Sequence, residues 1–191
     1  IDDGEVMPLW GAADLVTGET LPILTGMIEQ HITADIAFAV WQYYIATADD
    51  DFMERFGYEI IMDTAKFWAS RLEWNETLDR YEINDVIGPD EYSEHVDNNA
   101  YTNYLAAYNM KLAENLINTL PGNENLKLRA VYDRLDKKLD LQALKTALEQ
   151  KLPKLYLPQP DAENGIIPQF DGYFDLKHID LKKYKESSVV G

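Results

Sequence analysis

The chain has 191 residues, 46% of them hydrophobic, and a formal net charge of -17 at pH 7. This length and apolar content fit one globular domain with its own core and exclude a disordered chain. An acidic surface without a basic cluster repels phosphodiester backbones, so we expect no nucleic-acid partner and attribute the charge to a solvated, soluble surface.

The sequence also lacks the features of disulfide-bonded, metal-binding and membrane-spanning proteins. It has no cysteine, and its histidines, His31, His95 and His178, are far apart, so we expect neither a disulfide nor a metal site. No apolar run approaches the roughly 20 residues of a membrane helix, and residue 1 is neither a methionine nor part of a leader. We therefore expect a cytoplasmic protein without membrane contact, and a chain cut from a longer one.

The first two predicted elements are a loop and a helix. Residues 1–30 are dense in Gly and Pro, which favours loop structure with a short turn. Residues 33–48 combine helix formers with apolar residues on nearly every side, which predicts a helix buried on most of its surface.

A second helix is predicted over residues 52–72. Asp51 and Glu54 have the spacing of a capping box ahead of an apolar pattern with helical period. Residues 73–98 follow without helical period, and we expect a short strand at 81–83 before the break at Gly88-Pro89.

Three more helices are predicted in the second half of the chain. Asn98 or Asn99 is expected to cap a helix that ends before Pro121, and Asp140 to cap the second of two helices over 126–138 and 140–151. The tail from residue 153 is rich in Pro and Gly and is expected to be mostly loop.

The fold class expected from these elements is all-α, with about five helices and unusually long loops. Such loops are uncommon in compact domains unless they are functional. We therefore expect the functional residues in the segments 22–32, 73–98 and 153–178.

The segment 86–103 contains four carboxylates, three amides, two tyrosines and a histidine. In an extended stretch neighbouring side chains face opposite ways, so one of Asp90 and Glu91 can face a substrate while the other fixes the loop. A carboxyl group that donates a proton at neutral pH needs burial or a nearby carboxylate, and Glu91 lies beside Tyr92 and Glu94. The alternative is that these groups only cap the next helix and bind loop amides.

The run Gly88-Pro89-Asp90-Glu91-Tyr92, with Glu94 and the residues 96–104 after it, closely resembles the signature of glycoside hydrolase family 65. The segments 28–37 and 40–44 also resemble the family pattern. The resemblance covers at least residues 22–110 and, weakly, 167–180.

The resemblance implies a partial (α/α)6 barrel, in which residues 1–191 supply about five of twelve helices of one catalytic domain that is incomplete at both ends. It implies that Glu91, the glutamate of the motif, is the general acid in the inverting phosphorolysis of an α-glucosyl disaccharide of the maltose type. The product would be β-glucose 1-phosphate, with inorganic phosphate as co-substrate and no other cofactor. The phosphate-binding residues would lie beyond Gly191, so the fragment alone would be inactive. Ser93 and Gln30 depart from the family pattern, which leaves the linkage preference open.

Further contacts with the disaccharide are expected from His31 and Glu29, because segment 22–33 should reach the open end of the barrel. The alternative for His31 is a cap or a buried partner. Sugar hydroxyls could also be bound by loop residues, each with loop shaping as the alternative: Tyr92, Glu94, Asn98 and Asn99. Among the tryptophans, Trp41 and Trp68 are expected in the core, whereas Trp74 lies in a loop.

Two rival functions remain at this point. One is a family 65 hydrolase of the acid trehalase type, which shares the fold and the acid but uses a second carboxylate to activate water. The other is an inactive helical interaction module. We expect the full-length protein to be a homo-oligomer, and the apolar edges of the fragment alone to cause self-association.

Overall fold

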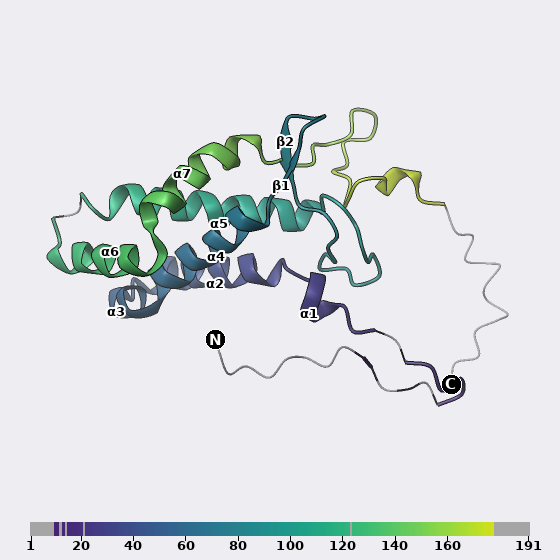
Figure 1. The fold of residues 1–191 in the computed structure, drawn as a ribbon, viewed down its shortest axis with the longest axis horizontal. Helices are drawn as coiled ribbons and strands as arrows, with labels where there is room; N and C mark the ends of the chain where they lie inside the picture. Colours follow the sequence, from purple (N-terminus) through teal and green to yellow (C-terminus); the bar gives the residue numbers. More distant parts are fainter. Residues whose placement is uncertain (1–9, 12, 14, 21, 123, 178–191) are drawn as a thin grey trace.

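The computed structural model describes residues 10–177 except 12, 14, 21 and 123, and His178 lies outside them (Figure 1). The described chain is mostly helical, with five helices of 11 to 20 residues and one small antiparallel sheet. None of its described helices is long and apolar enough to cross a membrane. The predicted helices are confirmed, but the class all-α overlooks the sheet.

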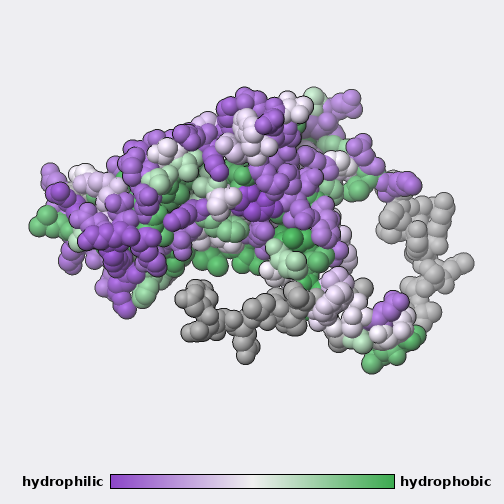
Figure 2. Space-filling model, viewed as in Figure 1, coloured by the Kyte–Doolittle hydropathy of each residue, from purple (hydrophilic) through white to green (hydrophobic). Residues whose placement is uncertain are grey.

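A short turn of helix, α1 (Thr25–Ile28), leads into α2 (Ile32–Thr47). The predicted helix is confirmed, but its predicted burial is wrong: its buried residues are Ala34, Ala37 and Val40, while Ile36 is 49% and Ile45 61% exposed. Only one side of α2 packs on the neighbouring helices, and Figure 2 shows apolar side chains along the edge of the body where α2 lies.

The second predicted helix is divided into α3 (Asp50–Phe52), a π-helical turn η1 (Met53–Gly57) and α4 (Tyr58–Arg71). Its predicted capping box is wrong. Ala48 ends α2 in the left-handed conformation, which places Asp49 ahead of the new helix, and the Asp49 carboxylate accepts a hydrogen bond from the Phe52 amide at 3.0 Å. Asp51 instead forms a surface ion pair with Arg55 at 3.2 Å.

The sheet is a hairpin of β1 (Glu73–Asn75) and β2 (Arg80–Glu82), with Trp74 opposite Tyr81. The turn forms because Asn75 Oδ1 accepts hydrogen bonds from the Thr77 and Leu78 amides, each at 3.1 Å. The predicted strand is confirmed one residue earlier than expected. Its partner β1 was missed because three polar and aromatic residues carry too little pattern.

The second half of the chain contains α5 (Ala100–Thr119), α6 (Leu126–Leu139), α7 (Leu141–Lys151) and the 3-10 turns η2 (Leu152–Lys154) and η3 (Tyr173–Asp175). Both predicted caps are confirmed, since Asn99 accepts from the Thr102 amide and Asp140 from the Ala143 amide, each at 3.1 Å.

The core lies where α4 packs between α2, α5 and α7, and it excludes Trp68 from solvent completely. Trp41, also expected in the core, is only partly buried against it. Fully buried aliphatic and aromatic side chains of this kind contribute roughly 1.5–3 kcal/mol each to stability. The core therefore fixes the ends of the helices from which the loops emerge.

The three long loops gather at one end of the helical body, as Figure 1 shows. The Ile87 amide donates to Ile28 O at 3.1 Å, the Tyr156 amide to Tyr81 O at 2.8 Å, and the Ala100 amide to Gln169 O at 2.8 Å. Segments that are remote in sequence thus form one joined structure, in which the candidate functional residues lie.

Candidate active site

The 86–99 loop is a closed structure that leaves the core and returns to it. Val86 and Val96 exchange two backbone hydrogen bonds of 3.0 Å, and the Asn98 amide donates to Ile83 O at 2.8 Å. His95 and Asn98 have positive φ angles of 55° and 52°, which a β-branched residue would adopt only with strain. The loop is therefore pinned at its base, and Asp90 and Glu91 lie in its outer part.

Asp90 and Glu91 lie in different surroundings, as predicted, but they belong to a turn and not to the extended stretch from which the prediction was made. The Asp90 carboxylate accepts hydrogen bonds from Gln169 Nε2 at 2.8 Å, the Tyr92 amide at 3.0 Å and Ser93 Oγ at 3.3 Å. The Gln169 amide, the Tyr92 amide and the Ser93 hydroxyl together hold the pKa of Asp90 below its ordinary value. Asp90 fixes the loop, whereas Glu91 forms no hydrogen bond or ion pair with any residue in the described chain.

The burial expected for Glu91 is absent from this part of the protein. Glu91 and Glu94 are exposed, and Tyr92 is 100% exposed. Because successive side chains on this outer turn point into solvent, neither neighbour shields the Glu91 carboxylate. That prediction is wrong for the described residues, and Tyr92 and Glu94 likewise make no side-chain contact there that would assign them a role.

Gly88 allows the loop to approach the start of α5 closely. A Cβ at this position would lie 2.8 Å from Asn99 Cγ, and ordinary van der Waals contact begins at 3.4 Å. Asn99 is fully buried, and its Oδ1 accepts from both the amide and the hydroxyl of Thr102, at 3.1 and 3.2 Å. Asn99 therefore shapes the loop from inside.

His31 joins the start of α2 to the same loop. It is 5% exposed, its Nδ1 lies 3.3 Å from Ile87 O, and its ring packs edge-on against Tyr101 at 5.6 Å. Its Nε2 lies 3.7 Å from a Glu29 oxygen and 3.9 Å from Asp35. The structure therefore brings both predicted sugar contacts, His31 and Glu29, beside the loop, with His31 as a buried partner.

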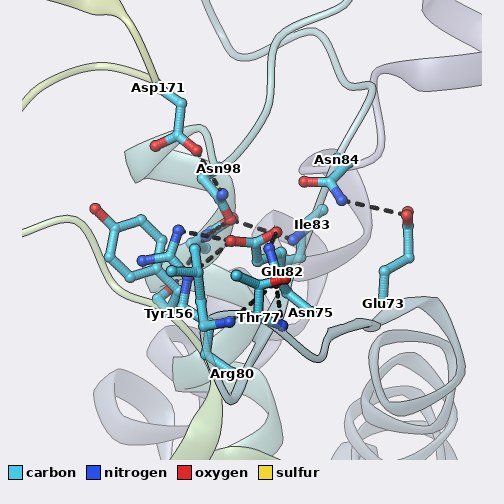
Figure 3. Close-up of polar contacts among 12 residues, drawn as sticks. Glu73, Asn75, Thr77, Arg80, Glu82, Ile83, Asn84, Asn98, Tyr156 and Asp171 are labelled. Carbon is cyan, nitrogen blue, oxygen red and sulfur yellow. Dashed lines mark hydrogen bonds and ion pairs between the residues drawn. The ribbon is translucent and has the colours of Figure 1, made fainter.

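Asn98 connects the loop to two other segments. Its Oδ1 accepts from the Ile83 amide at 3.4 Å and from Asn103 at 3.2 Å, and its Nδ2 donates to Asp171 at 2.8 Å (Figure 3). Asn98 is 1% exposed, so it too shapes the loop, which is the alternative that the sequence left open.

A polar cluster that the sequence did not reveal supports the base of this loop (Figure 3). Glu82 is 7% exposed and accepts hydrogen bonds from Arg80 at 2.7 Å and Asn75 at 3.0 Å. Burial opposes ionisation, but the Asn75 amide and the Arg80 guanidinium outweigh it and lower the pKa of Glu82. Arg80 also lies over the Tyr156 ring at 3.7 Å, which attaches the tail to the hairpin.

The other residues that sequence reasoning missed are Gln169 and Asp171. Both lie in the 153–178 segment, whose length signalled a function, but neither residue belongs to a recognisable motif. The partners of both are about 70 to 80 positions away in the chain. No three His, Asp or Glu side chains in the described residues are grouped so that they could bind a metal ion.

Comparison with known proteins gives one family. Residues 1–189 match the sequence model described as "Glycosyl hydrolase family 65 central catalytic domain". The kojibiose phosphorylase of Halothermothrix orenii is 48% identical over 181 residues, which are 95% of this chain and 23% of that protein. The kojibiose hydrolase of Flavobacterium johnsoniae is 46% identical over 112 residues, 58% of this chain and 16% of that protein.

A solved protein described as a putative kojibiose phosphorylase from the human microbiome has a similar fold. Its TM-score is 0.69 at 24% identity, over 83% of this chain and 22% of that one. The chain thus spans about a quarter of the length of the curated phosphorylase it matches.

Proposed function

The chain belongs to glycosyl hydrolase family 65, and on that premise we propose that its protein cleaves an α-glucosyl disaccharide by phosphorolysis, with Glu91 as general acid. The observation that carries the proposal is the contrast at the tip of the 86–99 loop. Asp90 is fully engaged in fixing the loop, whereas the adjacent Glu91 carboxylate has no partner among the described residues and is free to meet a ligand.

The chemistry requires one protein acid. Glu91 donates its proton to the glycosidic oxygen while the bond to the anomeric carbon breaks through an oxocarbenium-like state. Inorganic phosphate then attacks from the opposite face, so an α-glucoside gives β-glucose 1-phosphate with inversion. Phosphate is the nucleophile, and no second carboxylate is needed to activate water.

The proposed setting is an (α/α)6 barrel of which residues 1–191 form one incomplete part. The exposed apolar side of α2, with Ile36 and Ile45, is then a surface that the remaining helices cover. We also propose that the full-length protein is cytoplasmic and homo-oligomeric.

The substrate proposed here differs from the maltose-type disaccharide that the sequence led us to expect. The Halothermothrix relative, 48% identical over 95% of this chain, is named for kojibiose. We therefore place kojibiose first and maltose second among the substrates to be tested, with trehalose and nigerose after them.

Hydrolysis is the second candidate, because a relative named kojibiose hydrolase matches 58% of this chain at 46% identity. The two reactions share the acid and differ in what attacks the anomeric carbon, phosphate or a water activated by a second carboxylate. The 86–99 loop fits both reactions equally well.

The test uses the full-length protein, as wild type and as Glu91→Gln, incubated with the four disaccharides with and without phosphate. We expect phosphate-dependent β-glucose 1-phosphate from the wild type and at least about 10²-fold less from the variant, the range typical of a lost general acid. Phosphate-independent glucose would assign a hydrolase. Equal activity of the variant would exclude Glu91 as the acid, and no activity with any disaccharide would favour an interaction module.

A further inference from the structure

Segment 169–171 forms four hydrogen bonds in the described structure, three with the 86–99 loop and one with Ala100, the first residue of α5. Two join backbones, from the Ala100 amide to Gln169 O at 2.8 Å and from the Asp171 amide to Asp97 O at 3.0 Å. Two involve side chains, from Gln169 Nε2 to Asp90 at 2.8 Å and from Asn98 Nδ2 to Asp171 at 2.8 Å. Between them Phe170 is 7% exposed, so the segment is anchored by burial as well.

Three of these four bonds fix residues 97–100, where the loop leads into α5. Of the four, only the bond from the Gln169 side chain reaches the outer part of the loop. There it donates to Asp90 Oδ2, while Asp90 Oδ1 accepts from the Tyr92 amide and so closes a turn around Glu91. Ser93 Oγ adds a longer bond of 3.3 Å to Asp90 Oδ2. Among the described residues, Gln169 therefore contributes the one donor to this turn that comes from another segment.

We propose that Gln169 is a positioning residue for the general acid: its amide, held by the anchored 169–171 segment, fixes Asp90 and thereby directs the Glu91 carboxyl group toward the glycosidic oxygen. This inference rests on the proposed function of Glu91. Gln169 itself touches neither substrate nor phosphate in this role, and it acts only through the turn that Asp90 closes.

The physical reason is that Glu91 has no partner of its own among the described residues. Its direction follows from the backbone of residues 90–93, and a displacement of about 1 Å at a reacting group can cost roughly 10²-fold in rate. The lowered pKa of Asp90, for which the Gln169 amide is the largest cause, agrees with a bond that favours the charged carboxylate.

The variant Gln169→Leu in the full-length protein removes the donor and keeps the approximate size of the side chain. The matched control is Gln159→Leu in the same tail, because Gln159 is exposed and, within the described structure, its side-chain amide donates only to Leu157 O, two residues away. Each protein is assayed with kojibiose and with α-glucosyl fluoride, both in the presence of phosphate. Fluoride leaves without needing a proton from an acid, whereas the sugar of kojibiose needs one.

We expect Gln169→Leu to lower kcat with kojibiose by about 10- to 100-fold, to change KM little, and to leave the reaction of the fluoride within about threefold of wild type. Gln159→Leu should resemble the wild type with both substrates. Gln169→Glu should also lose activity with kojibiose at neutral pH and regain part of it on acidification, since the introduced carboxyl group can again donate to Asp90 once it is protonated.

Two outcomes overturn the inference. If kojibiose and the fluoride lose activity alike, Gln169 supports the whole site and does not position the acid; if neither loses activity, the bond to Asp90 has no role in the reaction. Failure of the proposed function is read separately, from wild type and Glu91→Gln with kojibiose. An undiminished Glu91→Gln enzyme would reject the acid, and this inference with it.

Discussion

The close approach of Gly88 to Asn99 allows a direct test of whether the 86–99 loop determines the position of Glu91. In Gly88→Ala the new Cβ would lie closest to Asn99 Nδ2 and 2.8 Å from Asn99 Cγ, so Cβ and Cγ must separate by more than half an ångström to reach the 3.4 Å of ordinary contact. Asn99 cannot turn away without losing the cap of α5, because its Oδ1 binds Thr102. The loop must therefore move, and Glu91 moves with it.

We expect Gly88→Ala in the full-length protein to lower kcat about 10- to 100-fold, because the reacting group is displaced by part of an ångström to one ångström. Overpacking of this kind also costs roughly 1–3 kcal/mol of stability. The assay is the steady-state phosphorolysis of kojibiose together with a thermal melt. Gly122→Ala is the matched control, since a Cβ there meets no atom of the described structure within 4 Å.

A second substitution separates the steric cause from a general loss of folding. Asn99→Ser keeps an oxygen that can cap α5 and removes the amide group that the new methyl would strike. With Asn99→Ser alone as the reference, Gly88→Ala combined with Asn99→Ser should recover most of the kcat lost in Gly88→Ala. A Gly88→Ala enzyme with wild-type kcat, or a double variant as slow as Gly88→Ala alone, would refute the reasoning.

The other predictions concern Asp90 and the exposed side of α2. The folded-state pKa of Asp90 is lowered, so its bonds stabilise the protein above the ordinary carboxyl pKa of about 3.9, and this stability is lost as the pH falls through the lower folded value. Asp90→Asn should therefore melt below wild type at pH 7 and approach it in a calorimetric series toward pH 3; a constant difference would contradict the assignment. The 191-residue chain expressed alone should self-associate in light scattering because Ile36, Phe38 and Ile45 are at least 40% exposed, and a monomer with a cooperative melt would show that α2 needs no cover.

The helices were predictable because their signals are local. Periodic apolar residues, the caps Asn99 and Asp140 and the breaks around Pro121 act within a few positions of the chain, and the structure has helices at these places. The capping box at Asp51 failed because a left-handed Ala48 places Asp49, and not Asp51, at the cap of the helix, which depends on how α2 ends. The predicted burial of α2 was wrong because apolar residues indicate only which surface of a helix can be buried. Which elements pack on that surface depends on the tertiary structure.

In the candidate site, too, local sequence signals were predictable and contacts between distant segments were not. The sequence singled out Glu91 through the resemblance of the contiguous motif around Gly88-Pro89 to the family signature, and it also predicted different surroundings for Asp90 and Glu91. Only the tertiary structure decided that Gln169 and Asp171 support that loop and that Asn98 lies inside it, since these contacts join segments about 70 to 80 residues apart through single hydrogen bonds. Such bonds leave no periodicity in a sequence, because each needs one donor and one acceptor whose positions are set by the packing of the helices between them.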